Sequence, residues 1–431
     1  MRSSRDRSSR QPPRALIAAL SLAAALVAAG CGIPPTPSRA AIVSTPRPST
    51  LPSPTGPFAT PTEAPPSPSG SALSSVPSPS IGPSQPASPP ASTAAQVQLP
   101  AITQPRAYSG AAFPPGYRLY HTYPQMVADV SAVARAHPDL VDLFSIGRSF
   151  QGATLLAARV SQDVHVDHGR PEALFDGLHH GLEHMSLEMT LQILHWLVDG
   201  YGRDPSITRL LQTRAVDIIF EVNPDGATYD IQGGVFHTWR KNRQPGPNGA
   251  IGTDLNRNYD DHWGCCGLVS ANPSSPYYRG RFAFSAPETR ALAAFVQSRV
   301  IGGRQRIRVA ITFHTSGRLI LWPYGYTRAS IASGMTADDH AVFVALGRAM
   351  AARNGYVPEQ ASKLYVDSGT ARDWEYGREH IFAFTFELAT GTYQPSSAIA
   401  PETSRNRSAI LYLIEMADCP YRAIGRAAQY C

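Results

Sequence analysis

The amino-acid sequence predicts an α/β domain in which a mixed, largely parallel central sheet is flanked by helices. The first observation behind this class is that apolar runs typical of strands alternate with helical patterns of about twelve residues or more. The second is that runs such as residues 381–388 are apolar at nearly every position, as expected of strands covered on both faces. In such sheets the functional site lies beyond the carboxyl ends of the strands. The residues that end or follow each strand are therefore the candidates for chemistry.

The part of the chain before this domain has a different composition. Of the 39 prolines in the 431 residues, 20 lie between residues 33 and 105, where most other residues are Ser, Thr, Ala and Gly. Such a stretch cannot bury a core, so residues 32–106 are predicted to form an extended, disordered linker. One domain over residues 107–431 remains.

The net charge of +6 does not indicate a nucleic-acid partner. Residues 1–30 hold five arginines and one aspartate, and residues 33–105 add two arginines and one glutamate. Five of the six net positive charges therefore lie before residue 106, and residues 106–431 carry a net charge of +1. No basic binding face is expected on the domain.

Residues 1–31 have the layout of a secretory signal peptide. A basic start is followed by an apolar run over residues 15–29, and small residues then lead directly into Cys31. This arrangement resembles the lipobox of bacterial lipoproteins, whose cysteine is acylated; the alternative is an ordinary cleaved signal peptide. In both cases the domain is expected to work outside the cytoplasm, and with Cys31 lipidated the linker would hold it off the membrane.

The elements of the domain follow from periodicity and composition. Residues 124–137 place Met126, Val130 and Ala134 on one face and are expected to form the first helix. Two runs on either side of Gly152 are expected to form a strand pair. The expected strands cover residues 141–146, 155–160, 172–178, 216–222, 308–313 and 381–388, and the later helices cover residues 187–200, 287–300, 337–354 and 405–416.

Candidate metal ligands follow two of these strands. The strand over residues 172–178 runs into His180 and Glu183, and the strand over residues 308–313 is followed by His314. Two imidazole nitrogens and one carboxylate oxygen suit Zn²⁺ in a catalytic site that keeps one position open. A zinc site at this edge of the sheet is therefore predicted.

A candidate base lies at the end of another strand. Glu387 is a carboxylate in the otherwise apolar strand over residues 381–388. Such a residue is costly unless it is paired or functional, and burial would raise its pKa toward that of a useful base.

The first motif has an alternative interpretation. The run from His180 to His184 also matches the inverted zinc motif HxxEH, in which both histidines bind the metal and Glu183 is the base. That motif requires both histidines on one helical face. The preceding strand places His180 at or before the start of the helix, and the alternative leaves His314 and Glu387 without roles.

Further motifs follow these residues in a fixed order. They are Asn-Pro-Asp-Gly at 223–226, Trp-Arg-Lys-Asn-Arg at 239–243, Thr-Asp-Leu-Asn-Arg-Asn at 253–258, and Phe-Thr-Phe-Glu-Leu at 384–388. With them the chain resembles the zinc metallocarboxypeptidases of the carboxypeptidase A type, and in particular the bacterial carboxypeptidase T-like branch. It shares with that branch Trp-Gly-Cys-Cys at 263–266 and Tyr-Arg-Gly-Arg at 278–281. The resemblance extends over about residues 116–416.

The resemblance implies a role for each matching catalytic residue. His180, Glu183 and His314 would hold one Zn²⁺ per chain, with a water in the fourth place. Glu387 would take a proton from that water and pass it to the leaving amine. Arg240, together with the metal, would stabilise the oxyanion.

The resemblance also implies how a substrate would be held. Asn256, Arg257 and Tyr365 would clamp the free C-terminal carboxylate of a peptide, with Arg257 forming a bidentate pair. This clamp would make the enzyme an exopeptidase. Asp254 would orient His180 from behind the metal site.

Two positions bear on specificity. The family commonly has Arg where this chain has Leu182, which leaves substrate contacts beyond the scissile bond open. Arg372 occupies the position that in the family lies at the floor of the pocket for the departing side chain. A guanidinium there predicts preference for C-terminal Glu or Asp over Lys or Arg, unless Arg372 pairs with Asp367 or Asp373.

Four cysteines of the domain are candidates for disulfides in an oxidising compartment. Four thiols allow three pairings, and the sequence does not determine which one forms. We favour Cys419 with Cys431, and a vicinal bridge between Cys265 and Cys266. A metal cluster is the weaker interpretation, because adjacent cysteines cannot supply the spaced ligands of a closed zinc site.

Two other functions compete with a peptidase acting on ordinary peptides. A non-catalytic, zinc-containing binding module would lack the base or a clamp residue, and this chain has all of them. An envelope hydrolase would use the same site on peptidoglycan stem peptides. The sequence therefore predicts a zinc carboxypeptidase whose substrates are peptides or proteins with a free C-terminus. Contact with the membrane is expected through the lipid anchor only.

Overall fold

The computed structural model describes residues 99–431. The predicted signal peptide, Cys31 and most of the predicted linker lie outside the described residues. Residues 99–106, which the sequence assigns to the linker, instead contact the domain: Leu99 and Ile102 are partly buried against the core. The backbone N–H of Thr103 donates to Thr154 Oγ1 at 2.8 Å, and its carbonyl accepts from Thr154 N at 3.1 Å. The packed part of the chain therefore begins before residue 107. Leu99 and Ile102, next to the last prolines of the stretch, supply apolar side chains that the core can bury.

Eight strands form one mixed sheet in the order β1-β2-β4-β3-β7-β10-β8-β9. Their bounds are β1 (Val141–Arg148), β2 (Thr154–Val160), β3 (Glu172–Gly177), β4 (Ala215–Ile219), β7 (Ile307–Thr315), β8 (Leu319–Trp322), β9 (Val357–Gln360) and β10 (Phe382–Leu388). The pairs β3–β4, β3–β7, β7–β10 and β8–β9 are parallel, and β1–β2, β2–β4 and β8–β10 are antiparallel. The predicted fold class is therefore confirmed. Outside this sheet, β5 (Val300–Ile301) and β6 (Arg304–Gln305) form a small hairpin.

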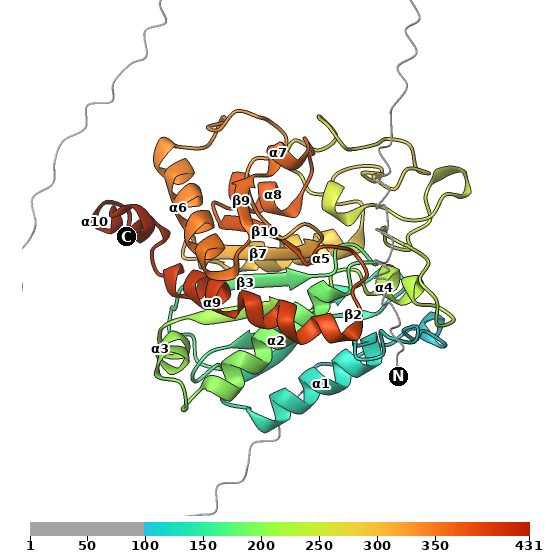
Figure 1. Ribbon diagram of the computed structural model, residues 1–431, viewed down its shortest axis with the longest axis horizontal. Helices are drawn as coiled ribbons and strands as arrows, with labels where there is room; N and C mark the ends of the chain where they lie inside the picture. Colours follow the sequence, from blue (N-terminus) through green and yellow to red (C-terminus); the bar gives the residue numbers. More distant parts are fainter. Residues whose placement is uncertain (1–98) are drawn as a thin grey trace, which may run out of the picture. The chain divides into compact units, whose positions relative to one another are not determined.

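Helices cover both faces of the sheet (Figure 1). One face carries the core shared by α1, α2, α3, α6 and α9, and the other carries the core shared by α5 and the first part of α8. The bounds are α1 (Tyr123–Ala136), α2 (Met185–Gly200), α3 (Pro205–Thr213), α4 (Pro224–Asp230), α5 (Pro287–Ser298), α6 (Ala337–Asn354), α7 (Ala361–Leu364), α8 (Ala371–Gly377), α9 (Ile399–Met416) and α10 (Ala427–Tyr430).

Alternation along the strands divides the core into two clusters. Ala173 and Phe175 of β3 face the α2 side, while Leu174 between them faces the α5 side. In the same way, Val309 and Ala310 of β7 belong to opposite clusters. Since both faces are buried, these strands are almost continuously apolar in sequence.

The differences from the predicted elements are local. Helix α6 has the predicted bounds, whereas α9 begins at Ile399 instead of residue 405. Pro401 lies in the first turn of α9, where its missing N–H has no intrahelical partner to lose, so the helix extends back past it. Elements α3, α4, α7, α8, β8 and β9 were not predicted; they are short and carry little periodic signal.

Both disulfides that we favoured from the sequence are formed. Cys265 is bonded to Cys266, and Cys419 is bonded to Cys431. The first lies in the long connection before α5, and the second ties the C-terminal residues to the end of α9. Within residues 99–431, no helix combines the length and the apolar character needed to cross a membrane.

Candidate active site

The metal-ligating segment begins where β3 ends. The chain turns at Leu178, which has a left-handed φ of 58°, and then presents His180 and Glu183 at the carboxyl edge of the sheet. The turn lies directly against α4: a Cβ on Gly181 would come within 2.4 Å of the carbonyl carbon of Gly226. Only glycine fits at this contact, so Gly181 sets how closely the turn packs.

Three candidate ligands meet at one point. His180 Nδ1 lies 2.9 Å from Glu183 Oε1, and His314 Nδ1 lies 2.9 Å from Glu183 Oε2. The two Nδ1 atoms are 3.1 Å apart. All three residues are buried, and one ligand atom from each lies within 4.8 Å of the other two.

The protonation states of these groups suit a bound cation. Burial lowers the pKa of His314 to about 4, so its ring is neutral at pH 7, which is the form that binds a metal. Burial alone would raise the pKa of Glu183, but His180 and His314 lower it overall, so Glu183 is ionised. Two nitrogens and one carboxylate oxygen fit the three protein ligands of a catalytic Zn²⁺.

A buried carboxylate supports this group from behind. Asp254 Oδ1 lies 3.2 Å from His180 Nε2, and Asp254 Oδ2 accepts a hydrogen bond from Arg240 Nε at 2.9 Å. Burial would raise the pKa of Asp254, but Arg240 and His180 lower it, which keeps the group ionised. A carboxylate in this position fixes the orientation of the His180 ring.

Asn256 contacts the ring nitrogen of His314 that does not face Glu183. Its Nδ2 is 3.2 Å from His314 Nε2, and its Oδ1 accepts a hydrogen bond from the backbone N–H of Ala371 at 2.9 Å. Both ends of the amide are therefore engaged within the protein. The sequence had suggested only a substrate contact for this residue.

The inverted HxxEH arrangement is not formed. His184 Nε2 lies 3.0 Å from Asp230 Oδ2, and His184 precedes the first residue of α2. The group of candidate ligands contains His314 and not His184.

Glu387 lies beside the ligands. It stands opposite His314 in the parallel ladder between β10 and β7, and only 9% of its surface is exposed. Burial, and then the negative charge of Glu183, raise the pKa of Glu387 to about 8. This carboxyl group therefore has the proton affinity expected of a general base or acid near neutral pH.

The guanidinium of Arg257 is buried with one end unused. Its Nε donates to the carbonyl of Leu268 and its Nη1 to the carbonyl of Asn256, each at 2.6 Å. Nη1 also lies 3.4 Å from Asp367 Oδ2. Nη2 is buried and has no hydrogen-bond partner among residues 99–431. Tyr365 stands over this group, with its ring centroid 5.9 Å from Arg257 Cζ, and remains 37% exposed.

The positive charge of Arg372 is compensated by two carboxylates. The sequence analysis left this pairing open as the alternative to a free guanidinium. Only 3% exposed, it donates from Nε to Asp373 Oδ1 at 3.0 Å, and its Nη2 lies 3.6 Å from Asp367 Oδ1. Its Nη1 donates to Thr385 Oγ1 at 3.2 Å. Burial raises the pKa of Asp373 to about 6 even though Arg372 opposes the shift. Arg372 is therefore not a free charge.

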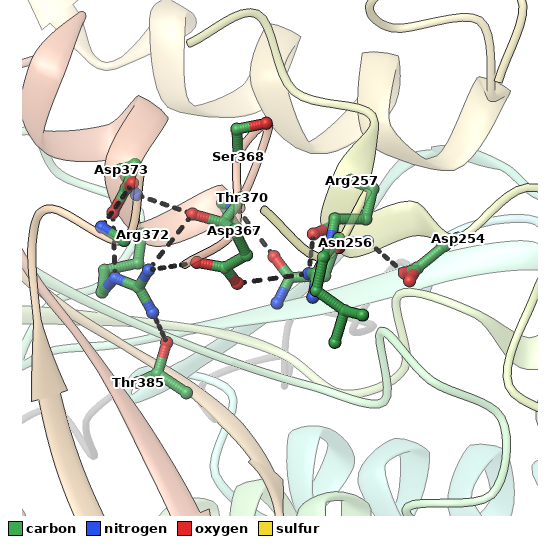
Figure 2. A network of polar contacts seen from close by, with 12 residues as sticks. Asp254, Asn256, Arg257, Asp367, Ser368, Thr370, Arg372, Asp373 and Thr385 are labelled. Atoms are coloured by element: carbon green, nitrogen blue, oxygen red, sulfur yellow. Dashed lines mark hydrogen bonds and ion pairs between the residues drawn. The ribbon is translucent and has the colours of Figure 1, made fainter. Parts of the chain in front are cut away.

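Two contacts in the network formed by Arg257, Asp367, Arg372 and Thr385 were not predicted from the sequence. Asp367 lies between the guanidinium groups of Arg372 and Arg257, so one carboxylate joins the two arginines (Figure 2). Thr385 precedes Glu387 by two residues in β10, which places both on the same face of the strand. That spacing was a usable signal for Thr385, whereas nothing local in the sequence indicates the Asp367–Arg257 contact.

Comparison with known proteins gives a consistent result. The zinc carboxypeptidase family matches residues 126–409. A zinc carboxypeptidase of Saccharothrix mutabilis subsp. capreolus is 42% identical over 319 residues, 73% of each chain. Carboxypeptidase A1 of Rattus norvegicus is 29% identical over 320 residues, 72% of this chain and 73% of the rat protein. The crystal structure of thrombin activatable fibrinolysis inhibitor superimposes with a TM-score of 0.62 at 27% identity, covering 69% of this chain and 74% of the other.

Proposed function

The chain belongs to the zinc carboxypeptidase family, and we propose that it hydrolyses the C-terminal peptide bond of peptides or proteins outside the cytoplasm. The observation that carries this proposal is the convergence of His180, Glu183 and His314 beside Glu387 at the carboxyl ends of β3, β7 and β10. This edge is where an α/β sheet of this kind binds its substrate.

In this proposal His180, Glu183 and His314 hold Zn²⁺, which when bound acts as a Lewis acid toward water and the substrate carbonyl. Glu387 accepts a proton from the attacking water and donates it to the departing amine. A carboxyl group whose pKa burial has raised to about 8 is suited to carry that proton. Arg240, whose Nη1 is 4.0 Å from Glu183 Oε1, stabilises the negative oxygen that develops during attack.

The substrate's C-terminal carboxylate binds to Arg257, Asn256 and Tyr365 in this proposal. The support is the Nη2 group of Arg257, which is buried and has no partner among the described residues. Leaving such a donor unpaired is costly, and a carboxylate would satisfy it with a charge-assisted hydrogen bond. Tyr365, whose ring centroid is 5.9 Å from Arg257 Cζ, and Asn256, whose Nδ2 has a second hydrogen to donate, complete the clamp.

For the departing side chain, we propose a modest preference for Glu or Asp over Lys or Arg. Arg372 provides the positive charge, but Asp367 and Asp373 compensate most of it, and a substrate carboxylate must compete with Asp367. Asp367→Asn is therefore expected to raise the Glu-to-Lys ratio of kcat/KM by about tenfold, and Arg372→Met to lower it. The ratio is measured on one peptide scaffold ending in Glu, Leu or Lys, so effects on the shared C-terminal carboxylate cancel. Equal or better cleavage of the Lys peptide by the wild-type enzyme contradicts the preference.

The extracytoplasmic location rests on the N-terminal sequence. We propose that residues 1–31 contain a signal peptide and, at its end, a lipidated Cys31. The lipid on Cys31, which lies outside the described residues, would hold the enzyme at the membrane. Cys31→Ser is expected to release the protein into the soluble fraction. Retention of this variant in the membrane fraction contradicts the anchor.

Mass spectrometry of a peptide set tests the proposed activity. Peptides with a free C-terminus are expected to lose residues one at a time from that end, while the same peptides with an amidated C-terminus stay intact. Internal cleavage, or equal cleavage of the amidated peptides, would contradict an exopeptidase. Purified muropeptides in the same assay show whether stem peptides are also substrates.

A further inference from the structure

We infer that the turn closed by the Cys265–Cys266 disulfide positions the carboxylate clamp. Without the disulfide, the substrate's C-terminus should bind more weakly while the chemical step keeps its rate. This inference rests on the proposed role of Arg257 in binding that carboxylate.

The turn holds the guanidinium of Arg257 directly. The carbonyl of Leu268, two residues after the disulfide, accepts a hydrogen bond from Arg257 Nε at 2.6 Å. A guanidinium is planar, so anchoring Nε sets the direction of the other two nitrogens. One of these is Nη2, which is buried and unpaired among residues 99–431. Together with the Asn256 carbonyl, which accepts from Nη1, the Leu268 carbonyl therefore sets where the free donor points.

The same turn also holds the backbone next to Tyr365. The N–H of Leu268 donates to the carbonyl of Val366 at 2.7 Å, and the N–H of Cys266 donates to Ser368 Oγ at 3.4 Å. Gly267, with a left-handed φ of 70°, approaches Val366 so closely that a Cβ would lie 1.9 Å from its carbonyl oxygen. One short turn thus contacts both sides of the clamp.

No helix or strand of the described residues contains this turn. From the end of the short helix η3 (Leu255–Arg257) to the start of α5, the described chain forms no helix and no strand. A covalent bond between adjacent residues removes backbone freedom where secondary structure does not. The matched control is the Cys419–Cys431 disulfide, which lies in the C-terminal residues beyond α9 and contacts neither Arg257 nor Tyr365.

The test compares the double variant Cys265→Ser/Cys266→Ser with Cys419→Ser/Cys431→Ser, both loaded with zinc. We expect the first pair to raise KM about tenfold, the scale of one hydrogen bond to a charged group, with kcat within about twofold of wild type. The released amino acid carries the clamped carboxylate, so its inhibition constant should rise in parallel. The inhibition constant of the shortened peptide with an amidated C-terminus, which offers the clamp no carboxylate, should not change. In the control pair all four quantities should stay close to wild type.

Two further variants separate the possible failures. Gly267→Ala displaces the same turn without touching a cysteine and should give the same KM effect, which keeps the inference testable if the serine variant does not fold. Arg257→Ala should raise KM more strongly than either. If Arg257→Ala raises KM and neither turn variant does, the positioning role is wrong and the clamp stands. If Arg257→Ala leaves KM unchanged, the proposed clamp is wrong, and this inference with it. A fall in kcat at constant KM in the turn variants would also overturn the inference.

Discussion

Replacing Glu387 with Gln tests whether this carboxyl group is buried beside a negative charge. Burial and Glu183 raise the pKa of Glu387 from its ordinary value of 4.5 to about 8 in the metal-free protein. An acid whose pKa is higher in the folded state binds its proton more tightly there, so its contribution to stability falls as pH rises from about 4.5 to about 8. At about 1.4 kcal/mol per pKa unit, the wild-type protein should lose about 3 kcal/mol between pH 5 and pH 8 relative to Glu387→Gln.

The assay is urea unfolding of both metal-free proteins at several pH values from 5 to 9. The difference in the free energy of unfolding should grow in favour of Glu387→Gln up to about pH 8 and then level off. Glu359→Gln, which removes a carboxylate from a half-exposed position, controls for the loss of one negative charge. A stability difference between wild type and Glu387→Gln that stays constant from pH 5 to pH 8 would refute this account of the site.

The other predictions concern the metal and its support. About one zinc per chain should be found by elemental analysis, removed by chelation, and restored with activity by Zn²⁺ or Co²⁺; a chelated, metal-free sample that cleaves peptides at full rate would refute this. His314→Ala should lose the zinc while His184→Ala keeps it, because His184 is hydrogen-bonded to Asp230 instead; the reverse result would favour the HxxEH arrangement. Asp254→Asn should weaken zinc binding about 10- to 100-fold in competition with a chelator, and Asp230→Asn, which alters the partner of His184, should leave it unchanged.

The larger part of the fold was predictable because its elements are long or continuously apolar. Helix α6 is 18 residues long and buries Val342, Leu346 and Met350 along one face. Strand β10 is apolar at most positions because both faces of the sheet are covered. The short elements were missed for the opposite reason. Strands β8 and β9 have four residues each, too few for a period to be detected.

The candidate site divides in the same way. His180, Glu183, His314 and Glu387 could be brought together in advance because each lies at the end of a strand, and parallel strands end at one edge. The Asp367–Arg257 contact joins residues far apart in sequence, through loops whose course no local pattern specifies. The second contact of Asp367, with Arg372, was considered only as an alternative to a free guanidinium. In the structure Arg372 is paired with Asp367, because a buried charge requires partners.

The most direct test of the central claim is the turnover of Glu387→Gln on a peptide with a free C-terminus, measured with its zinc content. Gln keeps the size and hydrogen bonding of the side chain but cannot accept a proton. The account predicts that kcat falls by about two to four orders of magnitude while one zinc per chain is retained. A loss of only a few-fold with zinc in place would contradict the account and assign the base to another residue.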